Sequence, residues 1–506
     1  MTLARTWSVG LAGVHGAMVE VEVDMAAGVP HLALVGLPDA VVRQSVDRVR
    51  AAVVNAGASF PLRRITIGLS PAAMPKQGSG FDLALAAAVL AASGAVPKES
   101  VDRLVLLGEL GLDGSVRGIR GVLPAVLAAA RAGHAQVVVP AANAEEAALV
   151  DSVEVLAAHT LGEVLAHLAG HRPLTRHVRG PLPEPAPPPD LGDVVGQTAG
   201  RRAVEVAAAG GHHLYLAGPP GAGKTMLAER LPGLLPPLVE QAALEVTAIH
   251  SVAGTLPPGA PLVTRPTFEA PHHSATLAAL IGGGSGQIRP GALCRAHRGV
   301  LFLDEAPEFP RAVLDTLRQP LERGQVTIQR AAGSATFPCR AQLVLAANPC
   351  PCATAAGDTA CTCSPLERRR YQSRLSGPLL DRIDLRVDLP PVTRAAWLDG
   401  LGPPETTVEV ARRVAAARAV AGQRLAGTGL TVNSQVPGRM LRERFAVPRP
   451  ALRLAERALE RGALSVRGFD RVLRVAWTLC DLAGRTVPGP DEVAEALGMR
   501  LQRAAA

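Results

Sequence analysis

The sequence predicts an α/β protein with several domains, and three observations support this. The first part of the chain alternates strand-like apolar runs with alanine-rich helical stretches. A glycine-rich loop at residues 218–225 follows an apolar run and precedes a helix-forming segment, which is the order that a phosphate-binding loop requires. Beyond about residue 391 the strand signals fade and helical patterns follow. A chain of 506 residues is long enough for two to four domains of roughly 100–200 residues each.

The first domain is expected to cover residues 1–172. Its expected strands are residues 18–23, 31–35, 65–69, 104–107 and 136–139, and its expected helices are residues 41–56, 82–92 and 123–131. Residues 173–190 follow and contain the string R-G-P-L-P-E-P-A-P-P-P-D. So many prolines exclude a helix or a central strand and predict a semi-rigid linker.

Residues 191–395 alternate strands and helices again and are expected to form the core that holds the glycine-rich loop. Residues 396–506 are expected to be helical, with helices at residues 407–425, 450–461 and 468–483. The chain has a formal net charge of +8, and the basic surplus lies beyond the linker. A polyanionic partner is therefore expected there, although a surplus of this size also serves ordinary solubility.

Composition excludes several classes of protein. With 48% hydrophobic residues the chain can bury large cores, which excludes wholesale disorder. The apolar run at residues 83–96 is shorter than the ~18–20 residues of a membrane span. Residues 1–10 lack the basic start and apolar core of a signal peptide, and the seven cysteines do not resemble a secreted disulfide framework. We expect a cytoplasmic protein with no membrane partner.

The glycine-rich loop is the sharpest signal in the sequence. It reads G-P-P-G-A-G-K-T and comprises Gly218, Pro219, Pro220, Gly221, Ala222, Gly223, Lys224 and Thr225. Its glycines let backbone N–H groups wrap phosphates, and the following helix adds the positive end of its dipole. Lys224, one of only three lysines, is expected to reach the β- and γ-phosphates, and Thr225 to ligate Mg²⁺. The sequence therefore predicts a nucleoside triphosphate site, with ATP and Mg²⁺ as cofactors.

Two further apolar runs end in polar residues. Residues 299–305 read G-V-L-F-L-D-E, which places Asp304 beside the Mg²⁺ and lets Glu305 polarise the attacking water. The same acids can instead cap a following helix, expected at residues 308–319. A third run leads into Asn348, which is expected to orient that water or to sense the γ-phosphate.

Four of the cysteines are clustered in the string C-P-C-x8-C-T-C. They are Cys350, Cys352, Cys361 and Cys363. Four thiolates can surround one tetrahedral Zn²⁺, and with every position filled by protein we expect a structural site. Redox thiols and an iron–sulfur cluster are the alternatives. The adjacent His272 and His273 are expected to pack as polar side chains or to contact an insert rather than to bind a metal.

Three phosphate-facing elements on successive strands, followed by helices, resemble an AAA+ ATPase module. Four strings narrow the resemblance: R-P-x-F-x-A-P-H-H-S at 265–274, R-P-G-A-L-C-R-A-H-R-G-V-L-F-L-D-E at 289–305, N-P-C-P-C at 348–352 and S-G-P-L-L-D-R-I-D at 376–384. They resemble the magnesium-chelatase-like ComM/YifB family, and the match spans nearly the whole chain. It implies a Lon-protease-like N-terminal α/β domain, an AAA+ P-loop core and a helical C-terminal lid.

The resemblance also implies roles for two arginines near the nucleotide. Arg382 resembles the arginine finger that neutralises charge on the γ-phosphoryl group in a neighbouring subunit's site. A salt bridge to Asp381 or Asp384 is the alternative. Arg467 resembles the sensor-2 arginine and heads a helical stripe of arginines, continued by Arg471 and Arg474, which can equally be a solvated face.

A β-hairpin is expected at residues 324–338, where alternating residues flank the string A-A-G-S. In related AAA+ motors a hairpin at this place projects into the central pore. Arg330, beside the turn, is therefore a candidate DNA contact, and an ordinary exposed arginine is the alternative.

Residues 65–165 resemble the proteolytic domain of Lon, through the strings P-K-Q-G-S-G-F-D-L-A-L-A-A-A at 75–88 and L-G-E-L-G-L-D-G-S-V-R-G-I-R-G-V-L-P at 107–124. In Lon a serine precedes the helix and a lysine is its base. Gly80 and Pro124 stand at these positions, and neither side chain can perform the chemistry. Ser79 is one residue off without an evident base, and Lys76 does not fill the missing role. We expect an interaction or scaffolding domain without protease activity.

These features favour an ATP-driven ring, a hexamer, that acts on DNA. The family resemblance adds a specific task, branch migration while incoming DNA is integrated during natural transformation. A second hypothesis is a chelatase subunit that inserts Mg²⁺ into a tetrapyrrole, but the chain lacks the acidic or proline-rich middle that leads to an integrin-like metal-binding domain. A third is an ATP-dependent protease, against which Gly80 and Pro124 count.

Overall fold

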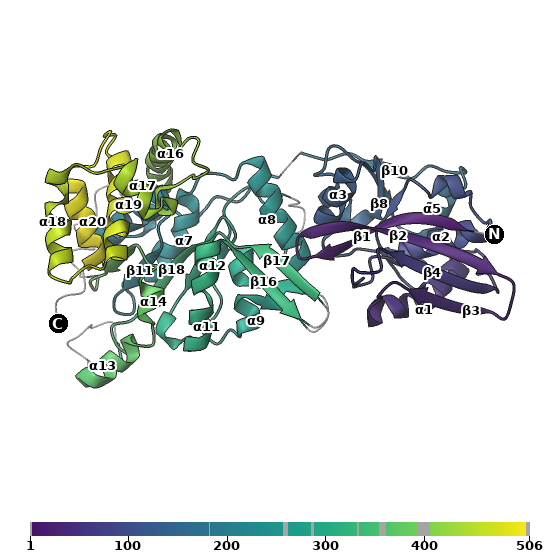
Figure 1. Cartoon of the computed structure of the whole chain (residues 1–506), viewed down its shortest axis with the longest axis horizontal. Coiled ribbons are helices and arrows are strands. Elements are labelled where there is room, and N and C mark those ends of the chain that lie inside the picture. The colour runs from purple at the N-terminus through teal and green to yellow at the C-terminus, as the bar shows by residue number, and fades with distance from the viewer. Residues whose placement is uncertain are drawn as a thin grey trace.

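The computed structural model describes residues 3–181, 183–256, 262–284, 288–330, 333–353, 361–392 and 405–501. An eight-stranded sheet organises the N-terminal part, a five-stranded sheet the middle, and helices make up the C-terminal part. The three parts follow one another along the long axis of the molecule (Figure 1). None of the helices in these ranges is long and apolar enough to cross a membrane.

The N-terminal sheet has the strand order β10-β9-β8-β5-β1-β2-β4-β3. Its strands are β1 (Ala4–Ala12), β2 (His15–Ala26), β3 (His31–Val35), β4 (Arg64–Ser70), β5 (Val105–Leu106), β8 (Gln136–Pro140), β9 (Glu154–Ala158) and β10 (Thr175–His177), and a small hairpin pairs β6 (Glu109–Leu110) with β7 (Val116–Arg117). The helices are α1 (Ala40–Asn55), α2 (Asp82–Ser93), α3 (Val122–Arg131), α4 (Ala144–Ala147) and α5 (Leu161–Leu168). Eleven of the twelve residues of α2 are buried, which explains why the helix is apolar on every side.

The expected strands and helices of this part are all present, but five strands and two helices had not been predicted. The missed elements are β1, β6, β7, β9, β10, α4 and α5, and β10 lies inside the segment expected to be a linker. Thr175–His177 pairs antiparallel with β9, so the first sheet extends beyond residue 172. The missed strands other than β1 have only two to five residues and carry little periodic signal. β1 has nine residues, but two of its buried positions are the polar Thr6 and Ser8, so it does not read as an apolar run.

The middle part is built on a parallel sheet with the order β12-β15-β18-β11-β19. The strands are β11 (Leu214–Ala217), β12 (Phe268–Glu269), β15 (Val300–Leu303), β18 (Gln342–Ala347) and β19 (Leu385–Asp388). Its helices are α6 (Thr198–Gly210), α7 (Lys224–Leu234), α8 (Glu240–Ala253), α9 (Leu277–Leu280), α10 (Ala292–Arg295), α11 (Arg311–Thr316), α12 (Arg318–Arg323), α13 (Pro365–Gln372) and α14 (Gly377–Leu380). Two hairpins are added, β13 (Gly282–Gly283) with β14 (Arg289–Pro290) and β16 (Gln325–Arg330) with β17 (Gly333–Pro338).

The C-terminal part consists of helices that pack directly on the middle part. They are α16 (Thr407–Arg424), α17 (Gly438–Glu443), α18 (Arg449–Glu460), α19 (Val466–Leu482) and α20 (Pro490–Leu501). One apolar cluster contains Val204 of α6, Leu385 of β19, Val414 of α16 and Val475 of α19. The helices therefore share a core with the nucleotide-binding sheet. The boundary expected at 395/396 lies outside the described residues.

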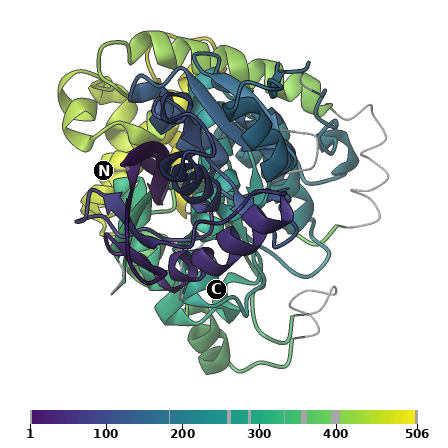
Figure 2. The ribbon, with the colours of Figure 1, turned by 90° about the vertical axis from the view of Figure 1, so that its right-hand side faces the viewer.

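The N-terminal part rests against the middle part beside the β16–β17 hairpin (Figure 1), and Figure 2 views the molecule from the N-terminal end. The turn between β1 and β2 contains Gly13, with φ of +68°, and a Cβ there would lie 2.7 Å from the carbonyl oxygen of Thr336 in β17. Ser251 of α8 donates a hydrogen bond to the buried carboxylate of Glu146 in α4. Only glycine fits at position 13, because the backbone there is left-handed and lies close to Thr336.

Candidate functional site

The predicted phosphate-binding loop connects β11 to α7. It begins at Gly218, turns through Gly221 (φ +78°) and Gly223 (φ +81°), and reaches α7 at Lys224. Left-handed backbone conformations of this kind are open to glycine without strain. Pro219, Pro220 and Ala222 occupy the remaining loop positions. The first turn of α7 therefore directs unpaired N–H groups toward the loop, which is the geometry that binds phosphate.

Lys224 lies at the centre of this loop and is 8% exposed. Its Nζ donates hydrogen bonds to the carbonyl oxygens of Gly218 (2.7 Å) and Pro219 (2.9 Å) and to Oδ1 of Asn348 (2.9 Å). Burial lowers the pKa of Lys224, and the nearby carboxylates of Asp304 and Glu305 oppose that shift. The structure thus brings together Lys224 and Asn348, which are 124 residues apart in the chain.

Asp304 follows β15 and faces the start of α7. Its Oδ2 accepts a hydrogen bond from Thr225 Oγ1 at 2.8 Å, and its Oδ1 accepts one from the backbone N–H of Glu305 at 2.8 Å. A hydroxyl and a carboxylate at this spacing are hard oxygen ligands of the kind that Mg²⁺ prefers. Glu305 itself has φ of +48°, an uncommon conformation for a residue with a side chain.

The acidic pair does not serve as the cap that was the alternative interpretation. The residue before α11 is Pro310, and Glu305 makes no side-chain capping bond to the short 3-10 turn Ala306–Glu308. The single helix expected at 308–319 is instead this turn followed by α11 and α12. Neither acid is therefore used as a helix cap.

Strand order explains why these side chains meet. β18, which ends just before Asn348, lies between β11, which leads into the loop, and β15, which ends just before Asp304. The three strands are parallel, so their carboxyl ends lie at one edge of the sheet. Ligands of open parallel sheets bind at this edge.

The sequence did not predict the partner of Glu305. His273 Nδ1 lies 3.2 Å from Glu305 Oε2, whereas Nδ1 of the adjacent His272 lies 2.8 Å from Ser274 Oγ. The two imidazole rings are 4.0 Å apart. β12 is parallel to β15, so the segment after β12 that carries both histidines reaches the same sheet edge as Glu305. The expectation that the histidines make polar contacts agrees with these distances.

Replacing His273 with alanine is expected to raise ATP hydrolysis in the absence of DNA several-fold. A carboxylate held by an imidazole is less available to polarise water, and the substitution removes that competitor. His272→Ala is the matched control, because His272 contacts Ser274 instead. Steady-state phosphate release by both variants tests this; an unchanged or lower rate in His273→Ala would assign the contact no role in restraining Glu305.

Arg382 lies at the other edge of the sheet. It precedes β19, whose Leu385 pairs with Leu214 at the start of β11, whereas the phosphate loop leaves β11 after Ala217. A strand of four residues spans about 13 Å, so Arg382 is separated from its own loop by the depth of the sheet. Its guanidinium donates to the carbonyl oxygen of Arg318 (3.1 Å) and to Glu322 of α12. Among the described residues its carboxylate partner is Glu322, rather than Asp381 or Asp384.

The other predicted arginines differ in exposure. Arg467 is exposed in the first turn of α19. Arg471 and Arg474 point inward: Arg471 pairs with Asp384, and Arg474 donates to the carbonyl oxygen of Val436 at 2.7 Å. The interpretation of the stripe as a solvated face is wrong for these two. Arg330 is exposed at the end of β16. It lies near the β13–β14 hairpin, where a Cβ on Gly283 would be 3.1 Å from the Arg330 guanidinium.

The four clustered cysteines converge. The sulfur atoms of Cys350, Cys352, Cys361 and Cys363 all lie within 4.8 Å of one another. Cys350 Sγ is 3.3 Å from Cys361 Sγ and 3.6 Å from Cys352 Sγ. Tetrahedral ligation at Zn–S distances of about 2.3 Å needs sulfur–sulfur spacings near 3.8 Å, so the four thiols fit a zinc ion. Cys350 is buried two residues after Asn348.

In the N-terminal part, the residues at the Lon-like catalytic positions make structural contacts. Pro124 is buried inside α3, and Gly80 accepts a backbone hydrogen bond from Gly108. Ser79 Oγ donates to Glu109, a partner that the sequence had not revealed. Lys76 is fully buried, and its Nζ donates to the carbonyl oxygen of Pro71.

The parallel sheet, the phosphate loop and the converging acids define a P-loop domain of the AAA+ type. Sequence comparison extends this to the whole chain. The family described as magnesium chelatase, subunit ChlI, matches residues 190–397, and two further ChlI families match residues 21–143 and 404–500.

The chain belongs to the magnesium-chelatase-like ComM/YifB family. It is 55% identical to an uncharacterised protein of Mycobacterium tuberculosis over 99% of both chains. It is 40% identical to the competence protein ComM of Haemophilus influenzae, over 99% of this chain and 98% of that one. It is 39% identical to YifB of Salmonella typhimurium, over 95% and 94%.

A shorter similarity supports the expected Lon-like part. A stretch of 166 residues, 30% of this chain, is 28% identical to Lon protease of Rhizobium meliloti and covers 20% of that protein. This similarity covers one segment of the chain, and it supports a Lon-like fold for that segment alone.

Proposed function

We propose that the protein is an ATP-hydrolysing ring motor that acts on DNA. The observation that carries the proposal is the convergence of Lys224, Asn348, Thr225 and Asp304 at one sheet edge. The loop residues 218–225 would hold the phosphates of ATP, and Thr225 and Asp304 would hold Mg²⁺, whose positive charge would offset the charge of the phosphates. Glu305 polarises the attacking water, and Asn348 orients it.

Arg382 supports the ring. A guanidinium on the far side of the sheet from its own loop cannot serve its own nucleotide, and an arginine that neutralises the transferring phosphoryl group is then supplied by a neighbour. Head-to-tail contacts of this kind close into a ring, proposed here as a hexamer. Release of Arg382 from Glu322 accompanies assembly. Arg467, exposed at the start of α19, is proposed to sense the nucleotide in its own subunit, with the C-terminal helices acting as a lid.

Two adjacent hairpins support DNA as the partner. Arg330 of β16 and Arg289 of β14 are both exposed, and β13 lies beside Arg330. Exposed arginines bind phosphates independently of base sequence. One relative is named a competence protein, which favours DNA over other polyanions. Branch migration during DNA integration is the proposed task, and the Lon-like part is proposed to bind partners or DNA without protease activity.

ATP hydrolysis in the presence of single-stranded, duplex and four-way DNA tests the proposal. We expect DNA to stimulate ATP hydrolysis, and branched DNA to stimulate it most. In Arg330→Ala we expect weaker stimulation, and the slope of log DNA affinity against log salt concentration is expected to fall by about one. Arg457→Ala, which removes an arginine from α18, is the control for a simple loss of positive charge. Equal rates with and without each DNA would contradict the proposal.

Tetrapyrrole metal insertion is the second candidate, because the matching families are described as chelatase subunits. It predicts ATP hydrolysis that responds to a porphyrin-binding partner complex and not to DNA. The same assay therefore separates the two functions.

We further propose that the cysteine cluster holds a structural Zn²⁺. Wild type is expected to contain about one zinc per chain, and Cys361→Ser to lose it and to unfold at a lower temperature, because structural zinc contributes folding free energy. Cys294→Ala, which changes a buried cysteine outside the cluster, keeps the metal. Elemental analysis decides the matter: iron in place of zinc, or no metal with four free thiols, would contradict the assignment.

A further inference from the structure

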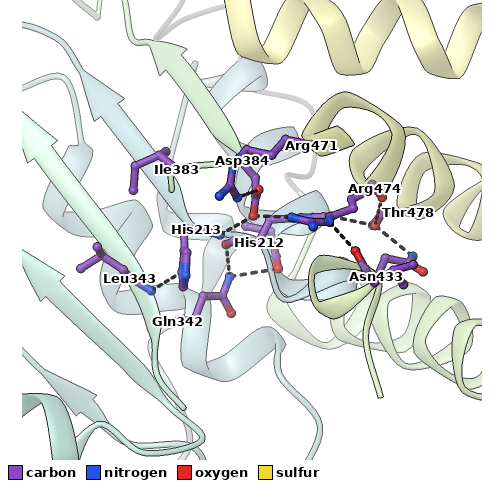
Figure 3. A network of polar contacts seen from close by, with 12 residues as sticks. His212, His213, Gln342, Leu343, Ile383, Asp384, Asn433, Arg471, Arg474 and Thr478 are labelled. Atoms are coloured by element: carbon purple, nitrogen blue, oxygen red, sulfur yellow. Dashed lines mark hydrogen bonds and ion pairs between the residues drawn. The ribbon is translucent and has the colours of Figure 1, made fainter. Parts of the chain in front are cut away.

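Asp384 lies two residues after Arg382 and is 2% exposed. Its Oδ1 accepts a hydrogen bond from Arg471 of α19, and its Oδ2 lies 3.3 Å from His212 Nδ1 and from the backbone N of His213 (Figure 3). Burial alone would raise the pKa of this carboxyl, but His212, Arg471 and His213 together lower it below its ordinary value. The side chain is therefore a buried carboxylate anion.

The same network continues into α19. His212 Nε2 lies 2.8 Å from Thr478 Oγ1, and Asn433 Nδ2 donates to that hydroxyl at 3.0 Å. A second arginine reaches the turn from α20, where Arg500 donates to the carbonyl oxygen of Ile383. The residues directly after Arg382 are thus held by α19 and by α20. Figure 3 shows the contact with α19, with Asp384 between Arg471 and His212.

The place of Asp384 in the chain gives this network its significance. On one side it is joined by a short turn to Arg382, the arginine proposed above to act on a neighbour's nucleotide. On the other side it holds Arg471, one helical turn beyond Arg467, which faces the solvent at the start of α19. A buried ion pair is weak support for stability, since desolvation offsets much of its attraction. Its geometric effect is definite, because a buried carboxylate leaves its partners few alternative positions.

We propose that Asp384 is a positioning residue for the reaction, which holds the Arg382 turn against α19 so that Arg382 is presented to the adjoining subunit's ATP. The inference rests on the proposed role of Arg382 in a ring. Asp384 touches no substrate; it acts through Arg382. When nucleotide binding in one subunit moves α19 of that subunit, the pair Arg471–Asp384 shifts Arg382 as well. The nucleotide site of one subunit thereby affects the site of its neighbour.

Mixed rings test this directly. Asp384→Asn keeps the shape and removes the charge; its own phosphate loop is intact, but its finger is displaced. Lys224→Ala lacks a working loop but keeps the finger. Alone, Asp384→Asn is expected to hydrolyse ATP about tenfold or more slowly than wild type. With excess Lys224→Ala, each Asp384→Asn loop receives an intact finger, and the rate per Asp384→Asn subunit rises several-fold. A purely structural defect in the Asp384→Asn subunit would not respond to its neighbour.

Arg382→Ala mixed with Lys224→Ala is the reference pair. If that pair recovers and the Asp384→Asn pair does not, the inference is overturned while the ring proposal stands. If the ATPase rate recovers in neither pair, Arg382 does not act between subunits, and both the inference and the ring proposal are contradicted. Wild-type activity of Asp384→Asn alone also overturns the inference. Should Asp384→Asn lack a cooperative unfolding transition, Arg471→Gln, which breaks the same pair from α19, is measured in its place and judged by the same outcomes.

Discussion

Alanine in place of Lys224 is expected to lower kcat/KM for ATP hydrolysis by about 10²–10³-fold. Removal of one preorganised donor to the charge that develops in a transition state has a cost of this size. Lys224 is the buried cation of the loop, and its current acceptors, the carbonyl oxygens of Gly218 and Pro219, lie where a phosphate would compete for its protons. Lys224→Arg is expected to fail as well, because a planar fork does not fit a pocket made for a compact ammonium.

Lys98→Ala is the matched control for this substitution. Lys98 lies in the short turn Lys98–Ser100 of the N-terminal part, far along the chain from the loop, and its loss should leave the rate unchanged. Unfolding temperature is measured for each variant, so that a loss of activity is not mistaken for a loss of fold. Hydrolysis by Lys224→Ala at the wild-type rate would contradict the assignment of the loop.

Arg382→Ala is expected to lower kcat about 10³-fold while nucleotide binding is largely kept. An arginine finger acts on charge that appears only in the transition state, so its loss affects turnover more than affinity. The control is Arg374→Ala, whose guanidinium pairs with Glu308 at 2.7 Å. Glu322→Gln provides a second comparison, because it frees Arg382 from its partner in α12 and is expected to keep or raise the rate.

Turnover and fluorescent-nucleotide affinity, measured together, separate the two interpretations of Arg382. If Arg382→Ala only loosens the contact with α12, the unfolding temperature falls and kcat stays near that of Arg374→Ala. Parallel losses of affinity and kcat would also count against a finger, because they would indicate a role in binding rather than in the chemical step.

The phosphate loop was predictable from the sequence because its determinants are local. Glycines at fixed spacing, an apolar strand before them and a helix after them all lie within about twenty residues. Asn348 was expected near the γ-phosphate because an apolar run leads into it, but its contact with Lys224 was not predicted. That contact arises because parallel strands end at one edge of their sheet. Thr225 and Asp304 were both expected beside Mg²⁺, and the hydrogen bond between their side chains agrees with that expectation.

The contacts that sequence reasoning missed are those between distant segments. Glu322 binds Arg382 across 60 residues, and Arg471 binds Asp384 across 87, and no periodicity or motif joins such pairs. The inward orientation of Arg471 was missed for the same reason, since an arginine stripe on a helix usually faces water. His273 could have been considered as a partner of Glu305, because both residues follow parallel strands, but the order of those strands was needed first.

The most direct test of the central claim is the displacement of a labelled strand from branched DNA. The protein is incubated with a four-way junction, ATP and Mg²⁺, and the released duplex arms are measured over time, with Lys224→Ala and Arg382→Ala alongside. An ATP-driven motor predicts ATP-dependent conversion of the junction by wild type and none by either variant. Absence of conversion by an actively hydrolysing wild type, or equal conversion by Lys224→Ala, would contradict it.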